Sequence, residues 1–283
     1  MSETTAPYGS GASGGDAKPV KRVRIRHLLE KKQRGDKITM LTTYDMYTAA
    51  IFDEAGIDIL FIGDSASNNV FGNATTIPVT VDELIPLVRA VARTAKRGLV
   101  LADLPFGSYQ ASPEQAFHTA VRFMKEADAH AVKLEGGAEM GPQVEMLTRN
   151  GIPVMAHIGF TPQSEHSLGG YRVQGRGDAA AKVLADARAM EDAGAFAVVL
   201  EMVPGDVAAE VTKTLSIPTI GIGAGVDCDG QVLVWTDMAG LRTGPVPRFV
   251  KRYADLHGVL LGAAQDFARE VTEGTFPGPE HTF

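Results

Sequence analysis

Cysteine is almost missing from this chain of 283 residues, in which Cys228 is the single example. One cysteine excludes a disulfide within the chain, and no Cys-x-x-Cys or His-x-x-x-His pair provides the usual spacing of a zinc site. A sequence without a disulfide framework is typical of a reducing compartment. We therefore expect a cytoplasmic protein.

Long apolar runs and an excess of positive charge are also missing. No run reaches the ~18 to 20 apolar residues that a membrane helix needs, and residues 1–18 lack the apolar core of a signal peptide. The chain has 27 Lys plus Arg against 34 Asp plus Glu, a net charge of −7. Nucleic-acid binding needs clustered Lys and Arg. The sequence therefore predicts neither a membrane nor a nucleic-acid partner, and a small anionic substrate would need a local cation.

The chain divides into a short tail and one long segment. Residues 1–20 are mostly small and polar and predict a disordered tail, whereas residues 21–283 have the composition of one globular domain, within a chain that is 45% apolar and 22% charged. Seven basic residues lie in the segment from Lys21 to Arg34, around a short helical pattern at Arg26–Gln33. Charge runs usually mark exposed faces, which favours a solvated capping helix over an anion site.

Short apolar runs recur along that segment, and each ends in polar or glycine-rich residues. Glycines at 56, 98, 151 and 194 end amphipathic segments just before four of these runs. The predicted strands are Ile38–Thr42, Ile57–Ile62, Leu99–Ala102, His130–Leu134, Ile152–Ala156, Phe196–Leu200, Ile217–Ile222 and Gln231–Met238. Eight strand and helix repeats predict an α/β fold, a closed parallel (β/α)8 barrel with its active site where the strands end.

Three helices have recognisable start signals. Asp45 is placed to cap the helix after the first strand, Thr80 begins a capping box, and Ser112 precedes a proline at the first helical position. The last two starts leave Asp64 and Asp103, at the ends of the second and third strands, without a capping duty.

Two further segments carry predictions about mobility and packing. The stretch from His157 to Gly177 is long and rich in glycine and serine, which predicts a mobile lid. From Arg248 onward the apolar residues are spaced like those of a helix that packs on the barrel, and the last ten residues look irregular.

Carboxylates leave three different strands at the same predicted rim. Asp64, Asp103 and Glu135 could converge on a hard cation such as Mg²⁺, which would also relieve the repulsion between them. The alternative is that each carboxylate makes separate hydrogen bonds to its own loop. Strand-end placement favours the metal site.

Three other ionisable residues point to the same rim. Lys133 is either an ion-pair partner or the cation for a substrate carboxylate. His157 is either a buried, hydrogen-bonded histidine or a group that handles protons or binds substrate. Glu201 follows a run of apolar residues, and a partly desolvated carboxylate is the stronger candidate for a general base.

Several motifs in a fixed order carry a family resemblance. They are GDS at 63–65, PVTVDEL at 78–84, ADLPFGSY at 102–109, AVKLEGG at 131–137, MAHIGFTPQS at 155–164, GGYRVQGRG at 169–177, LEMVP at 200–204 and IGIGAG..CDGQVLVW at 220–235. Over about residues 22–282 the chain resembles the 3-methyl-2-oxobutanoate (ketopantoate) hydroxymethyltransferase family, in its actinobacterial form.

This resemblance implies a TIM barrel of the phosphoenolpyruvate/pyruvate superfamily that uses Mg²⁺ and 5,10-methylenetetrahydrofolate. It implies that 3-methyl-2-oxobutanoate receives a hydroxymethyl group in pantothenate biosynthesis, and that the enzyme is a homo-oligomer, commonly a decamer. The implied metal ligands are Asp64, Asp103 and, partly through water, Glu135; the implied substrate contacts are Asp64, Ser65, Asp103, Lys133 and His157; the implied base is Glu201.

Two rival functions remain open on the sequence alone. Another metal-dependent 2-oxo-acid mutase or carbon–carbon lyase of the superfamily would be expected to carry a cysteine loop between the fifth and sixth strands, where this chain has no cysteine. A non-catalytic barrel would not need the carboxylates, lysine and base together.

Overall fold

Eight parallel strands form a closed barrel in chain order, with the last strand paired to the first. The computed structural model describes residues 21–283, so the predicted tail at residues 1–20 lies outside the described residues. The strands are β1 (Ile38–Thr42), β2 (Ile59–Ile62), β3 (Leu99–Asp103), β4 (Ala131–Glu135), β5 (Val154–Gly159), β6 (Ala197–Glu201), β7 (Thr219–Ile222) and β8 (Gly230–Leu233). The predicted (β/α)8 barrel is confirmed.

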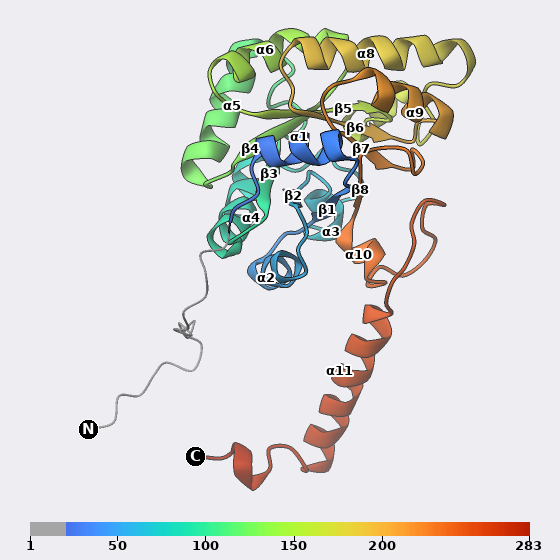
Figure 1. Cartoon of the computed structure of the whole chain (residues 1–283). Coiled ribbons are helices and arrows are strands. Elements are labelled where there is room, and N and C mark those ends of the chain that lie inside the picture. The colour runs from blue at the N-terminus through green and yellow to red at the C-terminus, as the bar shows by residue number, and fades with distance from the viewer. Residues whose placement is uncertain (1–20) are drawn as a thin grey trace.

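Helices surround this barrel, as Figure 1 shows. They are α1 (Ile25–Arg34), α2 (Met46–Glu54), α3 (Ala66–Asn69), α4 (Val81–Thr94), α5 (Pro113–Glu126), α6 (Gly141–Arg149), α7 (Glu165–Leu168), α8 (Ala180–Asp192), α9 (Gly205–Thr214), α10 (Trp235–Met238) and α11 (Leu256–Glu273). Short 3-10 turns are η1 (Ala138–Met140), η2 (Pro162–Ser164), η3 (Gly177–Ala179) and η4 (Pro279–His281). The three predicted caps are present, at Asp45, Thr80 and Ser112. Within residues 21–283 no helix is both long and apolar enough to cross a bilayer.

Alternation along each strand creates two cores. On β3, Val100 and Ala102 belong to the core between strands and helices, whereas Leu99 and Leu101 belong to the core inside the barrel. Successive side chains of a strand point to opposite faces, so one strand supplies both cores.

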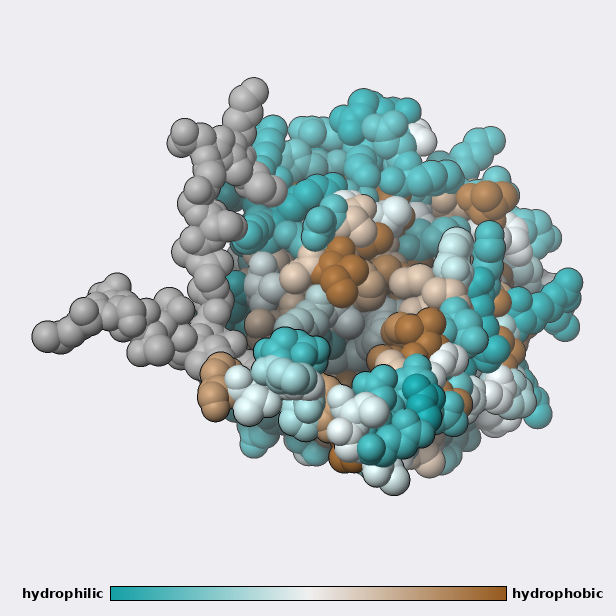
Figure 2. Space-filling view, turned by 90° about the horizontal axis from the view of Figure 1, so that it is seen from below, coloured by the Kyte–Doolittle hydropathy of each residue, from teal (hydrophilic) through white to brown (hydrophobic). Residues whose placement is uncertain are grey.

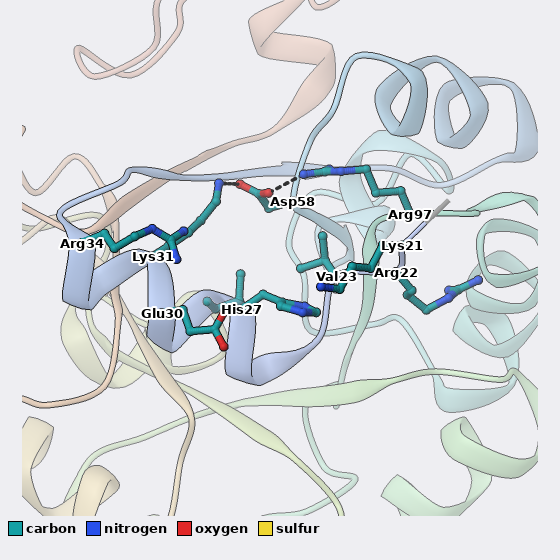
Figure 3. Close-up of a pocket in the computed structure, with 10 residues that line it drawn as sticks. Lys21, Arg22, Val23, His27, Glu30, Lys31, Arg34, Asp58 and Arg97 are labelled. Carbon is teal, nitrogen blue, oxygen red and sulfur yellow. Dashed lines mark hydrogen bonds and ion pairs between the residues drawn. The ribbon is translucent and has the colours of Figure 1, made fainter. Parts of the chain in front are cut away.

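Helix α1 closes the N-terminal end of the barrel, where Leu28 joins the interior core. Beside it, the buried carboxylate of Asp58 lies 2.6 Å from Lys31 Nζ and 2.8 Å from Arg97 Nη2 (Figure 3). Burial alone would raise the pKa of Asp58, but its hydrogen bonds with Lys31, Thr39 and Arg97 outweigh burial and lower that pKa. The basic segment therefore supplies a capping helix that ion pairs tie to the barrel.

The eighth strand is shorter than predicted. It ends at Leu233, and Trp235–Met238 forms helix α10 instead of continuing the strand. Only two residue pairs join β7 to β8, and the backbone N–H of Trp235 donates to the Thr42 hydroxyl, at 3.0 Å. The ladder between β1 and β8 ends after Leu233, because the backbone N–H of Trp235, which would extend it, donates to a side chain instead.

The predicted packing of the C-terminal helix on the barrel is wrong. Helix α11 begins only at Leu256, has no buried residue, and projects away from the barrel (Figure 1). Its apolar side chains Val259, Leu261 and Phe267 are 49 to 67% exposed. Amphipathic spacing predicted the helix correctly, but spacing alone carries no information about the surface that a helix covers.

Candidate active site

The inward-facing positions of the central strands change character toward the C-terminal end of the barrel. On β3, the apolar Leu101 is followed two residues later by Asp103, and β4 presents Lys133 and then Glu135. Strand register places Asp103 beside Lys133 and Glu135 beside His157 of β5. Because alternate residues of a strand face the barrel interior, the inward positions that are apolar within the barrel carry ionisable groups at the strand ends.

All the predicted site residues meet at one cavity of about 590 Å³. They are Asp64, Ser65, Asp103, Lys133, Glu135, His157 and Glu201. Five of them, all except Ser65 and Glu201, are at most 5% exposed. Such a cavity, apolar in its walls and ionisable at its floor, is the usual form of a small-molecule site.

Lys133 lies at the centre of the cluster. Its Nζ lies 2.8 Å from Asp103 Oδ1 and 3.8 Å from Glu135 Oε1. Burial lowers the pKa of Lys133, but Asp103 and Glu135 outweigh burial and raise it, so the ammonium is charged. The predicted ion pair is present, and because Lys133 also lines the cavity, a role in binding substrate remains a prediction.

His157 lies between two carboxylates. Its Nδ1 lies 3.2 Å from Glu135 Oε1, and its Nε2 lies 3.3 Å from Glu201 Oε2. Burial and the Lys133 charge lower the pKa of His157, but the two carboxylates outweigh them and raise it to about 9. At neutral pH the ring is therefore an imidazolium, with one N–H facing each carboxylate.

Among residues 21–283, Asp64 is the carboxylate of this cluster that forms no ion pair of its own. Burial and the charges of Asp103 and Glu135 raise the pKa of Asp64 well above its usual range. Burial likewise raises the pKa of Asp103, whereas His157 and Lys133 overcome burial and lower that of Glu135. One lysine thus faces three buried carboxylates, a donor set that suits a hard divalent ion.

The carboxylates do not enclose an ion by themselves. Within residues 21–283, no group of three His, Cys, Asp or Glu side chains is arranged to hold a metal unaided. Mg²⁺ commonly binds one or two carboxylates and keeps water or substrate oxygens as its other ligands. The residues therefore fit a magnesium ion completed by substrate and water.

Ser65 lines the cavity at the start of α3. Its Oγ lies 2.8 Å from the hydroxyl of Tyr44, a buried residue after β1. Burial raises the pKa of Tyr44 to about 12, so its hydroxyl stays protonated and can hold Ser65 in place.

Sequence reasoning missed Gln163 and Tyr109, two buried residues that contact the cluster. Gln163 Nε2 donates to Asp64 Oδ2 at 3.0 Å, and the Tyr109 hydroxyl donates to Gln163 Oε1 at 2.8 Å. Both residues lie in motifs of the family resemblance, MAHIGFTPQS and ADLPFGSY. No periodic pattern marks a loop glutamine as buried, so the motif was the one available signal.

The segment after β5 crosses the mouth of the barrel. Gly159 has φ 91°, and a Cβ there would collide with the carbonyl of Glu201. Phe160 is buried, its N–H donates to that carbonyl at 2.8 Å, and its ring lies 4.7 Å from that of Tyr171, which lines the cavity. The first residues of this segment are thus fixed to the barrel, and the predicted lid motion beyond them stays a prediction.

The fold and this cluster define a (β/α)8-barrel enzyme whose active site lies at the C-terminal ends of the strands. The fold resembles the crystal structure of phosphonopyruvate hydrolase in complex with oxalate and Mg²⁺, with a TM-score of 0.58, 12% identity, and 91% of this chain and 92% of that chain covered. It also resembles 2,3-dimethylmalate lyase, a member of the PEP mutase/isocitrate lyase superfamily, with a TM-score of 0.55, 16% identity, and 90% and 92% covered. These likenesses concern the fold alone.

The sequence comparisons identify the family. The family model "Ketopantoate hydroxymethyltransferase" matches residues 22–279. The chain is 73% identical to a 3-methyl-2-oxobutanoate hydroxymethyltransferase of a Nocardioides species, covering 99% of this chain and 97% of that protein. It is 69% identical to the corresponding protein of Saccharopolyspora erythraea, covering 99% and 94%.

The chain therefore belongs to the ketopantoate hydroxymethyltransferase family, as its motifs predicted. It is a transferase with the ketopantoate hydroxymethyltransferase activity of pantothenate biosynthesis. Family membership implies methylenetetrahydrofolate as the cosubstrate. The mutase or lyase alternative and the non-catalytic barrel are both excluded.

Proposed function

We propose that Glu201 begins the reaction by removing the proton from C3 of 3-methyl-2-oxobutanoate. The observation that carries this assignment is the position of Glu201: its carboxylate lines the same cavity as the Lys133–Asp103 ion pair and is 13% exposed. A base at this place reaches a substrate in the cavity yet is largely shielded from water. The imidazolium of His157 lies next to it, with Nε2 3.3 Å from Glu201 Oε2.

The anionic substrate binds with its carboxylate toward Lys133 and Ser65. Lys133 supplies the local positive charge that an acidic protein must provide for an anion. Apolar side chains of the cavity wall, Val199, Ile222 and Val232, offer a surface for the branched alkyl group. His157 faces the oxygen-bearing end of the product.

We assign Asp64 and Asp103 as direct ligands of Mg²⁺ and Glu135 as a ligand through water. When bound, the ion would polarise the keto and carboxylate oxygens and stabilise the negative charge that follows proton removal. The raised pKa values of Asp64 and Asp103, caused by burial, support a site that requires a further cation.

The carbon–carbon bond forms in the next step. The deprotonated C3 attacks the methylene carbon of the folate, opened to its iminium form, and the new bond takes the electron pair left by the proton. Water then adds its hydroxyl to that methylene carbon while the carbon–nitrogen bond breaks, and the leaving folate nitrogen keeps the electron pair and takes the proton of water to give tetrahydrofolate. The product is 2-dehydropantoate.

Exchange of the C3 hydrogen with deuterium tests this proposal without folate. The wild-type protein should exchange C3 of 3-methyl-2-oxobutanoate with Mg²⁺ and slow strongly after chelation. Asp103→Asn should lower Mg²⁺ affinity and exchange together while circular dichroism shows a folded protein. Unchanged Mg²⁺ titration in a folded, inactive Asp103→Asn protein would reject the ligand assignment.

We further propose that the protein is cytoplasmic. We also propose that it self-associates, and the position of α11 supports this second proposal. A helix that follows β8 would ordinarily pack between α9 and α2, because β8 pairs with β7 and β1. Helix α11 leaves that place, and Met46, Tyr47 and Ile51 of α2 are 50 to 74% exposed. Figure 2, seen from the side where α2 and α11 lie in Figure 1, shows apolar residues around a hollow. We propose that α11 of a second copy covers this surface within a homo-oligomer, a decamer by family analogy.

A further inference from the structure

Gln163 connects the segment after β5 to two of the three carboxylates. It lies in η2, is 4% exposed, and its backbone N–H donates to Glu135 Oε2 at 2.9 Å. Its side-chain Nε2 donates to Asp64 Oδ2 and to the carbonyl of Leu104, both at 3.0 Å. One residue therefore holds carboxylates from the ends of two different strands.

The orientation of the Gln163 amide is determined by its four neighbours. Its Oε1 accepts from the Tyr109 hydroxyl at 2.8 Å and from Gln110 Nε2 at 3.2 Å. The carbonyl of Leu104, which faces Nε2, can only accept. A flipped amide would place its oxygen against this carbonyl, so the N–H groups point at Leu104 and Asp64.

The hydrogen bonds from Gln163 occupy one oxygen of each carboxylate and leave the other oxygen for other partners. At Glu135, Oε2 is held by Gln163, while Oε1 faces Lys133 and His157. At Asp64, Oδ2 is held by Gln163, and within residues 21–283 no other side-chain hydrogen bond reaches this carboxylate. The second oxygen of Asp64 is therefore available to a ligand in the cavity.

We propose that Gln163 is the positioning residue of the magnesium site, orienting Asp64 and Glu135 before the ion binds. This inference rests on the proposed metal site. Residues that hydrogen-bond to metal ligands typically contribute 10- to 100-fold in metal affinity, because they fix the direction of the ligand oxygens. Gln163 does so for two ligands from one loop.

Replacement of Gln163 by methionine removes the side-chain amide that donates to Asp64. It keeps a side chain of similar length and the backbone N–H that donates to Glu135. Gln163→Met should bind Mn²⁺, the probe ion, about 10 to 100 times more weakly in calorimetric titration without substrate. At saturating Mn²⁺ its C3 exchange should recover toward the wild-type rate, because the base is untouched. Failure to recover, with normal Mn²⁺ affinity, would make Gln163 a residue of the chemical step and overturn the proposal.

A matched control is available in Gln143→Met. Gln143 is a buried glutamine of α6, and among the described residues its side chain forms no hydrogen bond with a carboxylate; its Nε2 donates to the carbonyl of Gln110 at 3.4 Å. Its replacement should leave Mn²⁺ affinity within about twofold of wild type. An equal loss in both variants would show a general effect of removing a buried amide and would overturn the role of Gln163.

Tyr109→Phe provides a second test that removes one oxygen atom. Without the hydroxyl, the Gln163 amide loses its shortest contact, and the backbone of Glu135, which also hydrogen-bonds to this hydroxyl, loses a partner. Mn²⁺ affinity should fall by about threefold to tenfold, less than in Gln163→Met. This variant decides the question if Gln163→Met does not fold, and wild-type affinity would then overturn the proposal. A wild-type protein that binds no Mn²⁺ would instead refute the metal site itself.

Discussion

His157 Nε2 lies 3.3 Å from Glu201 Oε2, while the other ring nitrogen lies 3.2 Å from Glu135 Oε1. One imidazolium thus links the proposed base to a carboxylate of the proposed metal site. This contact involves only one of the two oxygens of the Glu201 carboxylate. It also separates the base from the cation Lys133, which pairs with Asp103.

Glu201→Gln should abolish proton removal and spare binding. The variant should bind Mg²⁺ and 3-methyl-2-oxobutanoate, because Asp64, Asp103 and Lys133 are unchanged. Its C3 deuterium exchange without folate should fall by about 10² to 10⁴, the usual cost of losing a general base. Wild-type exchange with product formation alone abolished would move Glu201 to the folate half of the reaction.

Lys133→Met should weaken the binding of 3-methyl-2-oxobutanoate far more than that of the folate. The ion pair with Asp103 adds a second expectation. A buried carboxylate left without its cation should lower the free energy of unfolding by about 3 to 5 kcal/mol. Calorimetric titration and urea denaturation measure the two effects. Equal losses of affinity for both substrates would leave Lys133 as a structural ion-pair partner.

Asp58→Asn should lower the free energy of unfolding in a pH-dependent way, because it removes the ion pairs at the N-terminal end of the barrel. At pH 7 we expect a loss of about 1 to 2 kcal/mol, moderated because Lys31 and Arg97 are 26% and 30% exposed. The pKa of Asp58 is lowered in the folded state, so its contribution is complete above the unfolded value, about 3.9, and is lost as pH falls through the folded value. The difference between wild type and variant, measured by denaturation, should therefore shrink below about pH 4. A constant difference from pH 7 to pH 3 would contradict this assignment.

Helix α11 should determine the assembly state. Light scattering of the wild-type protein should give a mass several times 30.0 kDa. Phe267→Asp places a charge on the apolar side of α11, where Phe267 is 59% exposed, and should yield smaller species. Gln265→Asp, an exposed polar position of the same helix, is the control and should assemble normally. A monomeric wild-type protein with full turnover would refute the oligomer.

Much of the barrel can be predicted from the sequence because it depends on local chemistry. Three kinds of signal each reflect interactions within a few residues: glycines after amphipathic segments, helix caps such as Thr80 with Glu83, and short apolar runs. Alternation along a strand also predicts that Lys133 and Glu135 lie on one face, since they are two residues apart. Chain order in a closed parallel barrel then brings the strand ends to one mouth.

Other features depended on partners distant in the sequence. The position of His157 between Glu135 and Glu201 follows from the register of β4, β5 and β6, which depends on closure of the whole barrel. Gln163 becomes a buried donor only because its loop meets the ends of two strands. The position of α11 could not be predicted for the same reason. A periodic apolar face indicates that a helix will be covered, but tertiary packing determines which surface covers it.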